Sequence, residues 1–155
     1  MKRTIVLAAV VLFCAGALAA AADPLLGAWK LNKDKSTFLN NPGPQSYLCT
    51  YADLGGGKIR FTADVVTAEG EKLRPTWEGR RDGKEVPFTG TPSYDSIINY
   101  PSKDGASGSW VAKKDGKQLH KGEWRLSPDG KTLTWEFQRT SPEGIIRNKW
   151  VLEKQ

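Results

Sequence analysis

The chain is 155 residues long, has 26% charged residues and carries a formal net charge of +6. This length suits one folded domain once a terminal segment is set aside. Basic and acidic side chains are interspersed along the chain, which argues against the clustered patch that nucleic-acid or membrane-surface binding requires.

The N-terminal segment has the three-part pattern of a secretory signal peptide. Lys2 and Arg3 precede an almost unbroken apolar run from Ile5 to Ala22, with small residues before two cleavage points, after Ala22 or after Ala19. We therefore predict a signal peptide over residues 1–22, a periplasmic or secreted protein, and a single domain over residues 23–155. Removal of the segment leaves 21 basic and 17 acidic side chains, a formal net charge of +4.

Two alternatives for the apolar run are a membrane anchor and a lipoprotein signal. The run is short for a bilayer span of about 20 residues and ends in alanines, which favours cleavage over anchoring. Lipoprotein processing would use Cys14, and Phe13 before it is unfavourable. We therefore expect no stable membrane insertion after cleavage.

Turn signals at short intervals divide the rest of the chain into β-type runs. Asp82-Gly83, Asp115-Gly116 and Pro128-Asp129-Gly130 are typical of tight hairpins. The runs between the turns are rich in β-branched and aromatic residues, as strands are. We predict strands at Leu26–Leu31, Ser46–Asp53, Lys58–Val66, Lys72–Arg81, Lys84–Phe88, Tyr94–Tyr100, Ser109–Lys114, Gln118–Leu126, Thr132–Arg139 and Ile145–Glu153.

Several of these runs alternate apolar and polar residues, which indicates one buried and one solvated face. Neighbouring strands joined by short hairpins form an up-and-down antiparallel meander. A meander of about eight to ten strands can close into a barrel with room for side chains or one small ligand. The irregular stretch Asn32–Gln45 is either a loop across the barrel mouth or a plain linker, with short helical turns expected around Lys33–Phe38.

The first predicted strand carries Gly27-Ala28-Trp29. This resembles the Gly-x-Trp opening of the calycin superfamily, which includes lipocalins, fatty-acid-binding proteins and avidins. The longer string from Leu26 to Asn32, with Pro42-Gly43-Pro44 and the later hairpins, resembles small exported bacterial lipocalin-like proteins, largely uncharacterised. The resemblance implies a lipocalin-like barrel in which Trp29 closes one end beneath a cation of the last strand, Arg147 or Lys149.

No catalytic or metal motif stands out in the sequence. His120 is the single histidine and shares a predicted inward face with Trp124, so it is a weak candidate for an acid/base or ligand contact. A metal site needs three or four ligands, which one histidine and Cys49 do not supply. We expect no metal and no cofactor, and we expect Cys49 to be either a buried inert thiol or a reactive one.

Aromatic residues are the most suggestive class, with six tryptophans in the chain. They either fill a narrow barrel or line a cavity for a small hydrophobic or aromatic molecule. The predicted ligand contacts are Trp77, Trp124, Tyr51, Tyr94, Tyr100 and His120.

Three functions follow from this sequence. We expect an exported protein that binds or carries a small hydrophobic ligand, rather than an enzyme. The alternatives are a small barrel enzyme (a lyase, isomerase or cyclase) that uses His120 as acid or base, and an envelope inhibitor or assembly module directed at another protein.

Overall fold

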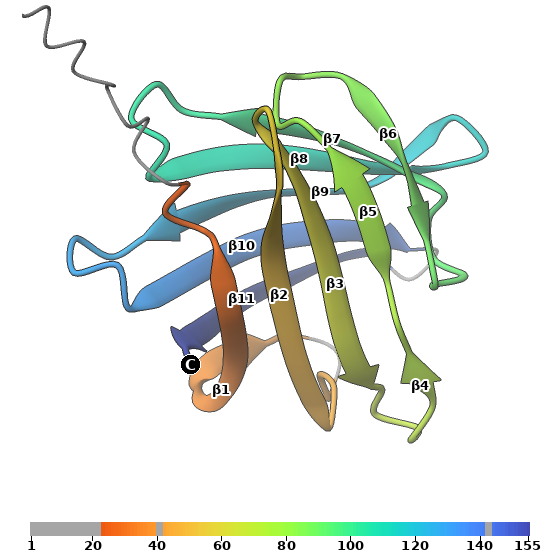
Figure 1. Ribbon diagram of the computed structural model, residues 1–155. Helices are drawn as coiled ribbons and strands as arrows, with labels where there is room; N and C mark the ends of the chain where they lie inside the picture. The colour runs from red at the N-terminus through yellow and green to blue at the C-terminus, as the bar shows by residue number, and fades with distance from the viewer. Residues whose placement is uncertain (1–22, 40–41, 142–143) are drawn as a thin grey trace, which may run out of the picture.

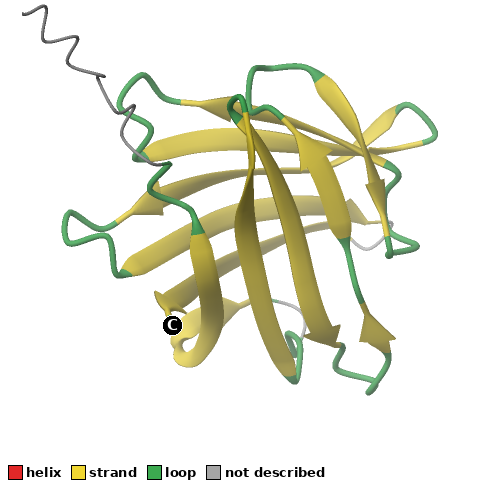
Figure 2. Ribbon diagram, viewed as in Figure 1, coloured by secondary structure: helices red, strands yellow, loops and turns green. Residues whose placement is uncertain are grey.

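The computed structural model describes residues 23–39, 42–141 and 144–155, so the predicted signal peptide lies outside the described residues. Within these ranges the chain forms strands and loops and no helix (Figure 2). The all-β prediction is therefore confirmed. The strands are β1 (Gly27–Phe38), β2 (Ser46–Gly55), β3 (Lys58–Val66), β4 (Lys72–Leu73), β5 (Thr76–Gly79), β6 (Glu85–Thr89), β7 (Ser96–Pro101), β8 (Ser107–Lys114), β9 (Lys117–Leu126), β10 (Thr132–Ser141) and β11 (Gly144–Lys154).

The strands close into a barrel, as predicted. The hydrogen-bonded order is β2-β1-β11-β10-β9-β8-β7-β6-β5-β3-β4, and β2 also pairs with β3. Ten antiparallel strands thus form a ring, and β4 is an extra strand on β3. In Figure 1 the strands β1, β2, β3 and β5 cross in front of β8 to β11. Closure leaves no free edge in the ring, which removes the main aggregation hazard of a sheet.

The predicted strand Lys72–Arg81 is interrupted. Pro75 has no N–H to donate to a strand ladder, and β4 ends at Leu73 while β5 begins at Thr76. The carbonyl of Pro75 still accepts a hydrogen bond from the Ala63 N–H at 2.9 Å, so the interrupted segment stays beside β3.

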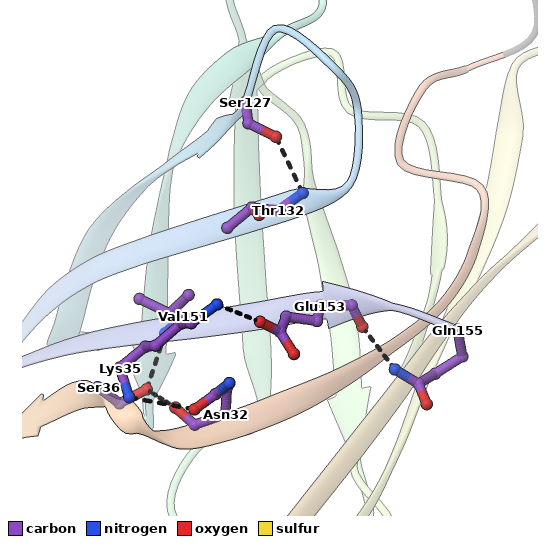
Figure 3. Close-up of polar contacts among 8 residues, drawn as sticks. All are labelled: Asn32, Lys35, Ser36, Ser127, Thr132, Val151, Glu153 and Gln155. Atoms are coloured by element: carbon purple, nitrogen blue, oxygen red, sulfur yellow. Dashed lines mark hydrogen bonds and ion pairs between the residues drawn. The ribbon is translucent and has the colours of Figure 1, made fainter.

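The prediction of helical turns around Lys33–Phe38 is wrong, because β1 continues to Phe38. The register between β1 and β11 shifts between Asn32 and Thr37, which marks a bulge. Figure 3 shows that Ser36 organises this bulge: its hydroxyl donates to the Asn32 carbonyl at 2.6 Å and accepts from the Val151 N–H at 2.9 Å. The bulge therefore replaces ladder bonds with side-chain bonds.

Trp29 in β1 is fully buried. The indole N–H of Trp29 donates to the Leu25 carbonyl at 2.8 Å, and the Lys154 Nζ lies 5.2 Å from the ring centroid. A Cβ at Gly27 would lie 3.2 Å from the Lys154 Cε, so glycine leaves room for this lysine.

The expected cation over Trp29 was Arg147 or Lys149, and this expectation is wrong. In the antiparallel register Trp29 lies opposite Lys154, whereas Lys149 lies opposite Thr37 near the other end of β1. Lys149 instead approaches Glu136 at 3.8 Å, and the Arg147 carbonyl accepts a bond from the Leu39 N–H. A cation of the last strand does lie over the Trp29 ring, but this cation is Lys154.

Among the described residues, no helix has the length and hydropathy needed to cross a membrane.

Candidate ligand-binding site

The barrel encloses a cavity of about 260 Å³. Its volume lies just below the range of about 300–1,000 Å³ that is common for small-molecule sites. Side chains of most strands and of the segments between them form its wall: Leu25, Tyr47, Tyr51, Phe61, Val65, Leu73, Pro75, Trp77, Arg81, Phe88, Thr91, Ser93, Tyr94, Ile97, Asn99, Trp110, Ala112, His120, Trp124, Trp135, Phe137 and Trp150. The aromatic residues therefore line the interior without filling it.

The aromatic rings of the wall hold one another in place. Phe61 stacks on Trp77 with centroids 6.1 Å apart, and Trp135 stacks on Trp150 at 6.3 Å. The ring of Tyr47 meets Trp150 edge-on at 5.0 Å. Such contacts fix the ring orientations, so the cavity has a preformed shape.

Gly122 makes room for one of these rings. It has the same strand parity as His120 and Trp124, whose side chains line the cavity. A Cβ at this position would lie 2.8 Å from the Trp110 ring and 2.7 Å from the Phe137 Cβ. Glycine at this position therefore allows the two aromatic side chains of neighbouring strands to meet across β9.

The structure brings five of the six predicted contact residues into the cavity wall: Trp77, Trp124, Tyr51, Tyr94 and His120. Tyr100 does not join them, because its side chain is 44% exposed and lines a groove on the outer surface. Ile97 and Asn99 hold the inward positions of β7, so Tyr100 faces outward. Tyr94 precedes β7 and does not share its alternation.

Polar groups are few in the wall, and three of them are unpaired. Arg81 Nη1, Asn99 Nδ2 and Trp150 Nε1 are buried and have no hydrogen-bond partner among the described residues. The other terminal nitrogen of Arg81, Nη2, forms an ion pair with Asp23, and the guanidinium lies 5.0 Å from the Trp124 ring centroid. All three unpaired atoms are N–H donors.

His120 is buried beside Tyr94, with the ring centroids 4.9 Å apart. Burial lowers the pKa of His120 to about 4, and the Arg139 charge opposite it in β10 adds to this effect. The imidazole is therefore neutral at physiological pH, and it lines the cavity in this form.

We expect the free energy of unfolding to fall by up to about 3 kcal/mol through His120 alone as the pH drops from about 6.5 to about 4. In the unfolded chain the imidazole has its ordinary pKa of 6.5 and takes up a proton in this interval. In the folded chain its pKa is depressed, so acid favours unfolding. Above about 6.5 both states are neutral and the contribution is constant.

Urea unfolding at about pH 7, 5.5 and 4.5 checks this expectation against His120→Gln, which cannot titrate. The wild-type protein should lose more stability than the variant over this range. Parallel declines of the two proteins would contradict the depressed pKa.

The other titratable groups of the interior are protonated at neutral pH. Burial raises the pKa values of Tyr47 and Tyr51 well above their ordinary range, and raises that of Tyr94 as well. Burial also raises the pKa of the Cys49 thiol, which is fully buried and free, so thiolate chemistry is suppressed.

Carboxylates that could serve as acid or base lie outside the cavity wall. Glu78 pairs with Arg60 at 2.6 Å, and Asp95 accepts a bond from the Asp115 N–H at 2.9 Å. Glu123 and Glu136 lie opposite each other in β9 and β10 and line an outer groove. In the part of the chain that the structure describes, no group of three or more His, Cys, Asp or Glu residues could hold a metal ion.

Sequence reasoning missed Arg81 and Asn99. Asn99 has the same strand parity as the apolar Ile97, and a polar residue at an inward position was a usable signal. Arg81 follows the last residues of β5 in a turn, where alternation gives no direction. Its partner Asp23 is distant in the sequence, so only the closed barrel brings the two together.

Solved structures of other proteins have a similar fold. A zebrafish ileal bile acid-binding protein complexed with cholic acid has a TM-score of 0.52 and 9% sequence identity, and the match covers 85% of this chain and 99% of that chain. The wild-type fluorescent protein UnaG has a TM-score of 0.50 and 13% identity, with coverage of 81% and 94%. The barrel is of the calycin, lipocalin-like type. No protein-family model and no curated protein sequence matches the chain.

Proposed function

We propose that this protein is exported and binds a small, largely apolar molecule inside its barrel. The observation that carries the proposal is the preformed cavity of about 260 Å³ with a wall of aromatic side chains and a few inward polar groups. Binding sites for small molecules have this composition, and stacked rings provide contact area at little entropic cost.

Solid aromatic packing would have argued for a purely structural interior. Here the rings pack edge-on or stacked along the wall, and the space between them stays open. An apolar ligand entering this space would remove apolar surface from water, which is the main driving force for such binding.

The variant Ala112→Leu should lower the affinity for the uncharged fluorescent probe 1-aminoanthracene by about tenfold or more. Ala112 is fully buried and lines the cavity, so a larger side chain occupies the volume that a ligand needs. Fluorescence titration measures the affinity, and circular dichroism with urea unfolding verifies the fold.

Ala52→Leu is the matched control, because Ala52 is a strand residue beside the inward Tyr51 and outside the cavity wall. This variant should bind the probe as the wild type does. Absence of probe binding to the wild type, or equal affinities of all three proteins, would overturn the proposal.

Native mass spectrometry of the protein from its own host tests both parts of the proposal. Export predicts a polypeptide that begins at Asp23 or Ala20 in the periplasm or medium. Ligand carriage predicts an additional mass that solvent extraction removes. Recovery of the uncleaved chain from the cytoplasm would contradict export without affecting the binding experiment.

A further inference from the structure

The cavity wall contains buried hydrogen-bond donors that lack a partner within the described residues. Arg81 Nη1 and Asn99 Nδ2 are buried without a hydrogen-bond partner among the described residues, although both side chains line the cavity. The Arg81 side chain is 9% exposed and Asn99 is 7% exposed. Buried donors are almost always paired in folded proteins, so this arrangement indicates a partner that the chain itself does not supply.

Arg81 is held through one of its two terminal nitrogens, and the other has no hydrogen-bond partner among the described residues. Asp23 binds Nη2, while the second Asp23 oxygen accepts a bond from the Leu25 N–H at 3.0 Å. The Trp124 ring lies 5.0 Å from the guanidinium and supports it from inside the barrel. The guanidinium is therefore positioned before any ligand arrives, which reduces the entropic cost of binding.

Asn99 is tied to the same region of the barrel. The Gly83 N–H, in the turn that follows Arg81, donates to the Asn99 carbonyl at 2.9 Å. The Asn99 side chain shares the inward face of β7 with Ile97, whose side chain is apolar. One polar region thus borders a wall that is otherwise mostly aromatic and aliphatic.

The charge of the wall favours an anionic group. Of the described residues that line the cavity, Arg81 is the one with a formal charge at neutral pH, and its ion-pair partner Asp23 lies outside the lining. A guanidinium binds carboxylates through charge-assisted hydrogen bonds, which are stronger than neutral ones.

We infer that the ligand is a compact apolar carboxylate, whose head group binds Arg81 and Asn99 and whose apolar body lies among the aromatic rings of the cavity. This inference rests on the proposed function and specifies its ligand class. The cavity of about 260 Å³ restricts the body to a short chain or a small ring system.

Isothermal titration with decanoate and 1-decanol tests the inference, because the two probes share their apolar body and differ in the head group. Wild-type protein should bind decanoate at least about tenfold more tightly than 1-decanol. Arg81→Met should lose this preference through weaker decanoate binding, while its affinity for 1-decanol stays within about threefold of the wild type.

Arg80→Met is the matched control, since Arg80 is exposed and the substitution removes the same charge from a neighbouring position. It should retain the preference for decanoate. Because Arg81→Met leaves the Asp23 carboxylate without its ion-pair partner, the double variant Asp23→Asn with Arg81→Met is measured as well. It should behave as Arg81→Met does.

The outcomes separate this inference from the proposed function. Equal wild-type affinities for decanoate and 1-decanol, or an unchanged preference in both Arg81 variants, would overturn the carboxylate site and leave apolar ligand binding intact. Failure of the wild type to bind decanoate, 1-decanol and 1-aminoanthracene would overturn both.

Discussion

Trp29→Ala is expected to lower the free energy of unfolding by about 3–5 kcal/mol. Trp29 is fully buried, donates its indole N–H to the Leu25 carbonyl and lies beneath the Lys154 ammonium. Truncation removes the buried ring, leaves a cavity and leaves the Leu25 carbonyl without that donor. Urea unfolding measures the loss as a shift of the midpoint at constant slope.

Trp29→Phe distinguishes the stability contributed by the buried ring from that contributed by the indole N–H. It keeps most of the apolar volume and removes the N–H donor, so the expected loss is about 1–2 kcal/mol. Leu48→Ala in β2 serves as a surface reference, because Leu48 is 38% exposed. If Trp29→Ala were no more destabilising than Leu48→Ala, the contacts of Trp29 would not contribute the stability that its burial indicates.

Gly90→Ala is expected to destabilise the protein by at least about 2 kcal/mol more than Gly130→Ala. Both glycines have positive φ, +76° and +66°, so both substitutions carry the cost of a left-handed backbone. They differ in their surroundings. A Cβ at Gly90 would lie 1.9 Å from the Arg74 carbonyl oxygen, whereas nothing lies within 4 Å of one at Gly130.

The clash at Gly90 involves backbone and cannot be relieved by a rotamer change. The turn after β6 must therefore move away from the chain between β4 and β5. Thr91 and Ser93, which line the cavity, follow directly, so Gly90→Ala should also weaken 1-aminoanthracene binding. Urea unfolding and fluorescence titration of the two variants measure both effects. If Gly90→Ala and Gly130→Ala lost equal stability, the turn after β6 would accommodate the added Cβ without cost, and the predicted clash would be contradicted.

Local sequence patterns determined most of the fold. Asp115-Gly116 forms the predicted hairpin between β8 and β9, with φ values of 49° and 73° at the two residues. The alternation in β9 correctly placed His120 and Trp124 on the inner face. Turn chemistry and period-two alternation depend on a few consecutive residues, and a run of short hairpins leaves few topologies open.

For residues outside a regularly alternating strand, only the tertiary structure shows whether the side chain faces the cavity or the solvent. Tyr94 and Tyr100 have the same sequence parity, yet Tyr94 lines the cavity and Tyr100 faces outward, because the chain before β7 is not a continuous strand. Similarly, the interruption at Pro75 changes one expected strand into β4 and β5.

Long-range register decided the remaining features of the site. Lys154, rather than Arg147, lies over Trp29 because β1 and β11 pair in that register. Arg81 pairs with Asp23, which lies 58 positions earlier in the sequence. The sequence by itself determined most of the strands, the turns that join them and which faces of the regular strands are apolar. Only the closed barrel decided which cation covers Trp29 and that an arginine enters the cavity, because these contacts join residues far apart in the chain.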